Sequence, residues 1–223
     1  MKIECIHPWD IKPAEARAIQ RELARRVVLE DRFSLVRTVC GVDISFKNNI
    51  ARAACVILRF PGFEPVECSI HLSPVKFPYV PGLLSFREIP ALLPALEKLK
   101  VDPDLLLVDG QGYAHPRRFG LASHLGLISD KPTVGCAKSR LLGIFREPGV
   151  EKGSMEYLYD GDEIIGVALR TRDNVKPVFV SVGHNISLHS AVRFVLDCCT
   201  MYRTPEPIRL AHLVAGGQVL KLR

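Results

Sequence analysis

The residues best able to do chemistry in this sequence are carboxylates placed among apolar residues. Asp109 directly follows the aliphatic run 105–108, and Asp43 interrupts the β-branched segment 38–46. Glu88 falls on the apolar face of a predicted helix. An acid in such surroundings is costly unless solvent, a counter-ion or a metal compensates for its desolvation.

Convergence of these acids would create a metal site. Carboxylates gathered at one point repel one another unless divalent cations lie among them. Oxygen ligands without cysteine favour Mg²⁺ or Mn²⁺ over zinc. Such a site activates a water and stabilises the leaving oxygen of a phosphodiester. The acids therefore indicate metal-dependent hydrolysis of a phosphodiester.

Each candidate residue, taken alone, also fits a structural role. Asp109 fits a cap of the turn after its strand, and Asp43 fits an exposed sheet edge. Glu88 fits a buried ion pair with an arginine. A lone lysine at a strand end, as at Lys138, is usually a solvated charge. His212, near the inward face of the last predicted helix, fits a hydrogen-bonded core histidine.

The predicted elements bring the acids toward one region of a sheet. Three strands joined by tight turns are predicted at 38–46, 51–60 and 64–72. They form an antiparallel meander, which is followed by a helix over 82–99 that Pro90 and Pro94 should kink or shorten. A fully buried strand over 105–108 then ends at Asp109, at the sheet edge where ligands bind in open α/β folds.

The remaining segments add helices and strands around this centre. Helices are predicted at 13–29, 120–128, 187–201 (with a Ser187 cap) and 204–215, and strands at 131–137, 156–159, 164–170 and 178–180. We expect one α/β domain over residues 1–223, with a central mixed sheet, an antiparallel three-strand meander and flanking helices.

Composition narrows the class of protein. The net charge of +6, from 30 basic and 24 acidic residues, favours a polyanionic partner. Seven cysteines without a CxxC pair indicate neither a disulfide framework nor a zinc site, and suggest reduced thiols. The N-terminal segment has no apolar signal core, and no apolar run approaches the length of a membrane span. We expect a soluble, cytoplasmic monomer without membrane contact.

The candidate residues lie within longer motifs that resemble the endonuclease V family, nucleases that repair deaminated bases. These motifs are GVDISF (41–46), FPYVPGLLSFRE (77–88), VDGQGYAHPRRFGLASHLG (108–126), VGCAKSRLLG (134–143), YLYDGDEIIG (157–166) and PEPIRLAH (205–212). The resemblance implies a ribonuclease H-like fold and a Mg²⁺-dependent endonuclease, with Mn²⁺ as a substitute. It also implies recognition of deoxyinosine in DNA and, more loosely, of other lesions, with a nick at the second phosphodiester on the 3′ side.

The resemblance assigns catalytic roles to individual residues. Asp43, Glu88 and Asp109 match the metal-binding acids of the family. His212 matches a histidine of the catalytic centre, and Lys138 matches a lysine near the scissile phosphate. No catalytic residue of the family pattern is missing.

A second group of residues is implied to bind DNA. Tyr79, on the proline-stiffened loop FPYVP, matches an aromatic wedge, although a tyrosine packed on its own core is equally common. Val80 stands where the family often has isoleucine. The residues implied to contact the strand or the flipped base are Tyr79, Val80, Pro81, Gly82, Leu84, Gly110, Gly112, His115 and Leu141.

Two other functions fit the same sequence. One is an inosine-specific endoribonuclease, because no residue here distinguishes the two sugars. The other is a protein that binds lesions without cutting, which the loss of an acid would have favoured.

Overall fold

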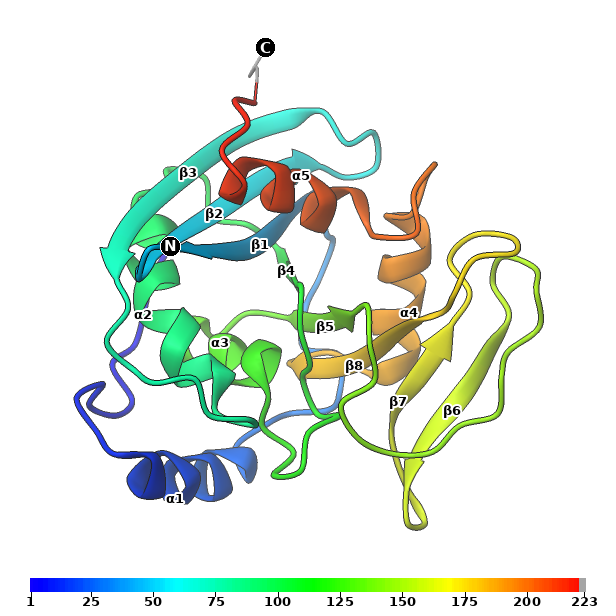
Figure 1. Cartoon of the computed structure of the whole chain (residues 1–223). Helices are drawn as coiled ribbons and strands as arrows, with labels where there is room; N and C mark the ends of the chain where they lie inside the picture. Colours follow the sequence, from blue (N-terminus) through cyan, green and yellow to red (C-terminus); the bar gives the residue numbers. More distant parts are fainter. Residues whose placement is uncertain (221–223) are drawn as a thin grey trace.

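The computed structural model describes residues 1–220, whose strands form one mixed sheet with helices on both faces (Figure 1). The eight strands are β1 Thr38–Lys47, β2 Ile50–Arg59, β3 Pro65–Pro74, β4 Leu105–Val108, β5 Thr133–Ala137, β6 Met155–Asp160, β7 Glu163–Leu169 and β8 Val178–His184. The helices are α1 Pro13–Ala24, α2 Leu84–Glu97, α3 Leu121–Ser129, α4 Leu188–Asp197 and α5 Glu206–Ala215.

The sheet has the order β3-β2-β1-β4-β5-β8-β7-β6. Strands β1 to β3 are antiparallel, which confirms the predicted meander. Asn48 and Asn49 connect the first two strands with φ angles of 49° and 58°, values that asparagine tolerates better than most residues. Strands β1, β4 and β5 are parallel, so that their carboxyl ends meet at one edge.

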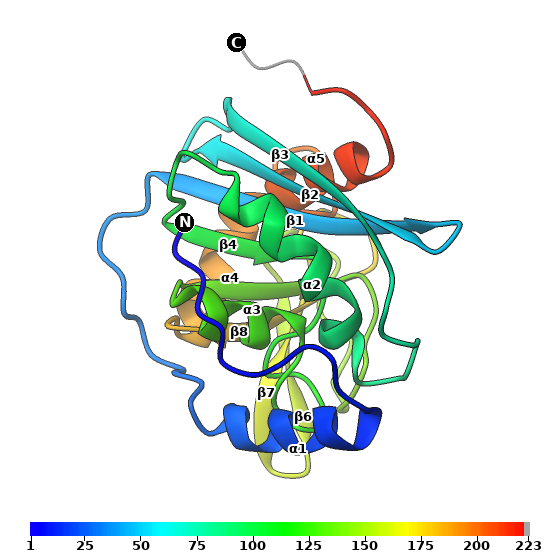
Figure 2. The ribbon, with the colours of Figure 1, turned by 90° about the vertical axis from the view of Figure 1, so that its left-hand side faces the viewer.

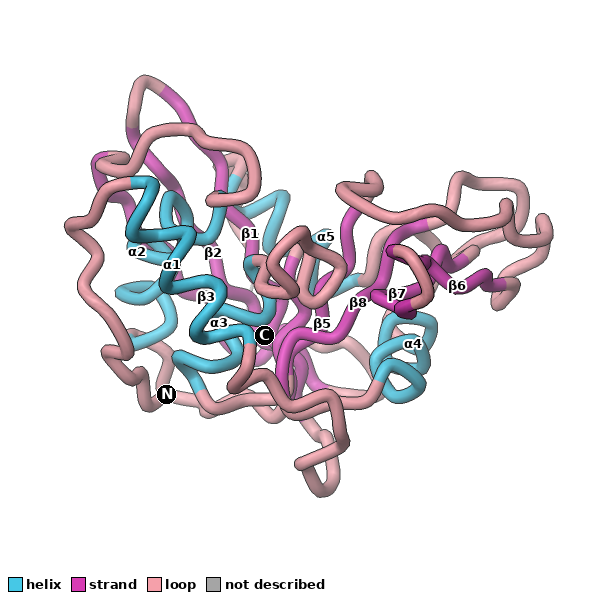
Figure 3. The backbone as a smooth tube through the Cα atoms, turned by 90° about the horizontal axis from the view of Figure 1, so that it is seen from below, coloured by secondary structure: helices cyan, strands magenta, loops and turns pink. Residues whose placement is uncertain are grey.

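Alternate side chains of β4 are buried on opposite faces of the sheet. Leu105 and Leu107 pack in a core with α4 and Ile208 of α5, whereas Leu106 and Val108 pack with α2 and α3. Figure 2 shows these helices on opposite sides of the strands, with α1 across one end. The β6–β7 hairpin extends away from this layered part (Figure 3). Within residues 1–220, no helix is both long enough and apolar enough to span a bilayer.

Several predicted boundaries were wrong. Helix α1 ends at Ala24 instead of residue 29, because the chain turns away and the Val28 N–H donates to His184 Nδ1 at 3.1 Å. Helix α4 ends at Asp197 instead of residue 201, with Ser187 as its predicted cap. Strand β8 continues to His184, beyond the predicted 178–180, because it pairs with β5.

Helix α2 continues through both of its prolines. Pro90 and Pro94 each remove a backbone donor, yet the helix runs from Leu84 to Glu97. Ile89 and Leu92 are almost fully buried against the sheet. Burial of this apolar face offsets the missing hydrogen bonds. The prolines therefore do not shorten the helix, which begins and ends two residues inside the predicted range 82–99.

Candidate active site

Asp43 and Asp109 lie side by side because β1 and β4 are parallel neighbours. Their register pairs Val42 with Val108, so the acid that follows each valine occupies the same level of the sheet. Strand β1 lies between β2 and β4, which contradicts the alternative of an exposed edge for Asp43. The side chains of Asp43 and Asp109 are only 14% and 17% exposed. The sheet thus holds two carboxylates in a mostly buried place.

His212 reaches this pair from α5. Its Nδ1 lies 2.7 Å from Asp43 Oδ2, and its side chain is 62% exposed, which excludes the core histidine considered above. Gly41 permits the approach, because a Cβ there would lie 2.0 Å from the Pro207 carbonyl oxygen of α5. Asp43, Asp109 and His212 each offer a ligand atom, and these atoms lie within 4.8 Å of one another. This set suits a divalent cation.

The electrostatics of the site favour a positive ion. Burial, and then the charge of Asp109, raises the pKa of Asp43. Burial also raises the pKa of Glu88 to about 8, with smaller contributions from Asp43 and Asp109. No ion pair within residues 1–220 includes Glu88, so the structure does not support an arginine partner for this acid. Glu88 therefore lies near the two aspartates, although outside the group of three ligand atoms.

Lys138 stands at the same sheet edge, directly after β5. Its Nζ donates to Asp109 Oδ2 at 2.6 Å, and its side chain is 45% exposed. The register that pairs Val108 with Gly135 brings the end of β5 beside Asp109. Lys138 is thus a paired cation at the acidic cluster rather than an isolated solvated charge.

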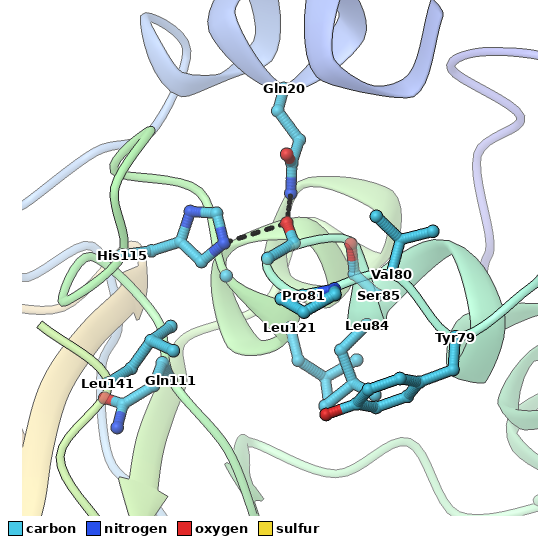
Figure 4. A pocket seen from close by; sticks show the side chains of 12 residues that line it. Gln20, Tyr79, Val80, Pro81, Leu84, Ser85, Gln111, His115, Leu121 and Leu141 are labelled. Carbon is cyan, nitrogen blue, oxygen red and sulfur yellow. Dashed lines mark hydrogen bonds between the residues drawn. The ribbon is translucent and has the colours of Figure 1, made fainter. Parts of the chain in front are cut away.

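A pocket lies close to the acids and contains most of the residues implied to bind DNA. Its lining consists of Gln20, Tyr79, Val80, Pro81, Gly82, Leu84, Ser85, Gln111, His115, Gly120, Leu121 and Leu141 (Figure 4). Tyr79 is 72% exposed at the pocket, which contradicts the alternative of packing on its own core. Gln111, two residues after Asp109, donates from Nε2 to the Ser139 carbonyl at 3.0 Å and so joins the pocket to the chain beside Lys138.

Gly110 and Gly112 do not belong to this lining, although Gln111 between them does. The Gly112 N–H donates to Ser181 Oγ at 2.9 Å, and a Cβ at Gly112 would lie 2.1 Å from the Val182 carbonyl oxygen. Gly112 therefore serves the close packing of its loop on β8. A Cβ at Gly110 would meet the side chain of Leu121, a lining residue, at 3.3 Å.

His115 holds the Tyr79 loop in place. Its Nε2 lies 3.0 Å from the Gly82 carbonyl, which requires the proton on Nε2, and its Nδ1 accepts from the Arg117 N–H at 3.2 Å. Burial, and then the charge of Arg117, lowers the pKa of His115 to about 4. The ring is therefore neutral near pH 7, and both of its nitrogens are already bonded within the protein.

A buried chain of hydrogen bonds orients Ser85, which the sequence analysis did not identify. His7 Nδ1 lies 2.7 Å from the Pro8 carbonyl and therefore carries a proton, so the neutral His7 Nε2 accepts from His124 Nε2 at 2.7 Å. His124 Nδ1 must then accept from Ser85 Oγ at 3.0 Å. Burial lowers the pKa of both histidines, which favours this neutral arrangement. The Ser85 proton is thus committed to His124, and the Ser85 oxygen remains an acceptor.

Comparison with known proteins decides the family of this chain. The family model described as Endonuclease V matches residues 21–213. The chain belongs to the endonuclease V family.

Relatives and solved structures of this family match this protein over nearly its whole chain. Endonuclease V of Rippkaea orientalis is 51% identical over 220 residues, which cover 98% of this chain and 96% of the relative. The crystal structure of the Bacillus subtilis Endonuclease V has a TM-score of 0.92 at 32% identity, covering 97% and 96% of the two chains. The family resemblance seen in the sequence and the expected ribonuclease H-like fold are both confirmed.

Related structures contain nucleic acid. A single-substitution variant of Endonuclease V from Ciona intestinalis, in complex with a DNA containing an inosine followed by a ribo-adenosine, is 33% identical with a TM-score of 0.82. The alignment covers 92% of this chain and 97% of the Ciona chain. The protein described here is accordingly a nuclease of the endonuclease V family. It shares its fold with the solved structures of this family.

Proposed function

We propose that this protein is a DNA repair endonuclease that recognises deaminated bases, chiefly deoxyinosine, and nicks the second phosphodiester on the 3′ side. The observation that carries the proposal is the position of the pocket beside the acidic cluster, connected through Gln111. An extruded base in this pocket would leave its strand close to Asp109. The inosine-containing DNA bound by the Ciona relative supports the same substrate.

Asp43, Asp109 and His212 would hold Mg²⁺, or Mn²⁺ in its place, with Glu88 as a further acid of the site. When bound, the ion would supply a Lewis acid that lowers the pKa of a water and stabilises the leaving oxygen. The raised pKa values of Asp43 and Glu88 fit this role, because a nearby cation offsets the cost of two buried negative charges.

The remaining residues position the strand. Lys138 can approach a phosphate while it stays beside Asp109, since nearly half of its side chain is exposed. Tyr79, exposed on a loop that His115 and the prolines fix, fits the space left by an extruded base. Gly110 and Gly112 would support the pocket from behind its lining.

We further propose that residues 1–223 form one domain that acts as a cytoplasmic monomer. Two alternatives remain. One is an inosine-specific endoribonuclease, and the other is a lesion-binding protein that does not cleave nucleic acid. Matched DNA and RNA strands, each with one inosine, separate these functions when incubated with and without Mg²⁺. Mg²⁺-dependent nicking of the DNA supports the proposal, cutting of the RNA alone supports the endoribonuclease, and binding without cutting supports the lesion-binding protein.

A further inference from the structure

Helix α1 carries a column of arginines that the proposed chemistry does not use. Arg17 and Arg21 lie four residues apart, and Arg25, the C-cap residue, lies four residues further on. Residues at this spacing are neighbours on one side of a helix, and like charges there destabilise the helix. We call Arg17, Arg21 and Arg25 the arginine column.

The arginine column is not compensated by acids within the described chain. Across residues 1–220, no ion pair at up to 4.0 Å includes any of its three members. Other arginines of this protein do have acidic partners: Arg118 contacts Glu163 at 2.6 Å, and Arg170 contacts Glu147 at 2.9 Å. The column therefore carries positive charge that an external anion can use.

Arg117 adds a fourth guanidinium to the same place. Burial, and then the charges of Arg17 and Arg21, lowers the pKa of Arg117. The side chains of Arg17, Arg21 and Arg117 are therefore close to one another. Arg117 donates through Nε to Gln20 Oε1 and through its terminal nitrogen to the Gly82 carbonyl at 2.7 Å. The basic surface of α1 is thus tied to a residue of the pocket.

Gln20 connects the helix to the pocket directly. It is 1% exposed, it lines the pocket, and its Nε2 donates to the Gly82 carbonyl at 3.1 Å. Figure 4 shows Gln20 reaching down from the helix on one side, with Gln111 and Leu141 on the opposite side. The opposite side is the one that continues to Asp109 and Lys138 through the Gln111 hydrogen bond to Ser139.

We propose that the arginine column binds the phosphodiester backbone on the 5′ side of the lesion. This inference rests on the proposed function, in which the nick is 3′ to the lesion and the 3′ part of the strand runs toward Asp109. The 5′ part then leaves across the opposite side of the pocket, past Gln20 and the arginine column. Guanidinium groups suit this partner, because their planar donors match phosphate oxygens in pairs.

The competing role for these arginines is local. Cations near a helix C-terminus interact favourably with the helix dipole, and Arg21 and Arg25 lie in that region. A dipole role predicts a loss of thermal stability on substitution, without any change in how DNA binding responds to salt. Phosphate contacts predict unchanged thermal stability and a weaker salt dependence of DNA binding on substitution, because each contact releases counter-ions.

The test compares the wild type with the double variant Arg17→Gln/Arg21→Gln. Glutamine keeps good helix propensity. Arg59→Gln, which removes one exposed arginine at the end of β2, is the control. The probe is a single-stranded DNA with one central inosine, and its dissociation constant is measured in Ca²⁺ from 50 to 200 mM salt. Single strands lose about 0.7 in log–log slope per phosphate contact, so the affinity advantage of the wild type over the double variant should shrink about sevenfold across this range.

Two further probes locate the contact on the strand. Shortening the flank on the 5′ side to two nucleotides should remove the difference between wild type and double variant, whereas shortening the 3′ flank should preserve it. A double variant with the slope of the control overturns the proposal, as does a difference that disappears only with the 3′ flank. A slope difference on a DNA for which the wild type shows no inosine preference would instead refute the proposed lesion recognition and leave the backbone contact standing.

Discussion

Replacing Glu88 with glutamine should stabilise the metal-free protein at neutral and alkaline pH. Glu88 is held near Asp43 and Asp109, and burial together with these charges raises its pKa from 4.5 to about 8. Glutamine has nearly the same shape and no charge to desolvate. Most substitutions at a buried site destabilise a protein, so a gain in stability would be a specific sign of a carboxylate kept for function.

The pH dependence follows from the direction of the shift. Because the folded state binds the Glu88 proton more tightly than the unfolded state, the free energy of unfolding of the wild type falls as the pH rises from 4.5 to about 8. At about 1.4 kcal/mol per pH unit, this amounts to about 3 kcal/mol at pH 7 and about 5 kcal/mol above pH 8. Below pH 4.5 the wild type and Glu88→Gln should have similar stability.

Urea unfolding at several pH values, with a chelator present, measures this difference. Glu97→Gln, at an exposed position of the same helix, is the matched control and should follow the wild type. Adding Mg²⁺ at pH 8 should then stabilise the wild type more than Glu88→Gln. A charge penalty at Glu88 is refuted if the difference between wild type and Glu88→Gln is independent of pH, or if Glu88→Gln is the less stable protein at pH 8.

Four further substitutions test the assigned roles at the site. Asp43→Ala or Asp109→Ala should abolish Mg²⁺-dependent nicking and keep most binding to an inosine strand in gel-shift assays; near-normal nicking by either variant would remove the metal assignment. Lys138→Ala should slow single-turnover cleavage at saturating enzyme by about 10²- to 10³-fold, whereas a loss of affinity alone would make Lys138 a docking contact. Tyr79→Ala should weaken binding in Ca²⁺ to inosine in a duplex more than in a single strand; an equal loss with a lower melting temperature would contradict a wedge.

The strands and the identity of the acids could be predicted from local sequence. Alternation in 38–46 and the aliphatic run 105–108 indicate strands because side-chain burial repeats every two residues or covers both faces. Asp43 and Asp109 stood out because acids are rare in such segments. Helix ends were predicted less well: α1 stops at Ala24, where a bond from Val28 to His184 competes with the helix.

The tertiary structure alone decided how the site is assembled. The parallel register of β1 and β4 sets the two aspartates at one level, and the close approach of α5 at Gly41 brings His212 to them. Neither follows from spacing along the chain, because strand pairing and helix packing join residues far apart in sequence.

The pocket shows the same division between sequence and tertiary structure. Tyr79 belongs to a recognisable motif, whereas Gln20 and Ser85 have no local signal of a functional role. Gln20 joins the pocket because α1 lies across the Gly82 carbonyl, and the Ser85 oxygen is left as an acceptor by two histidines, one of them in the N-terminal segment. The order of amino acids specifies which chemical groups this protein has, and the folded chain specifies which of them meet, since hydrogen bonds and charges act through space over a few ångströms.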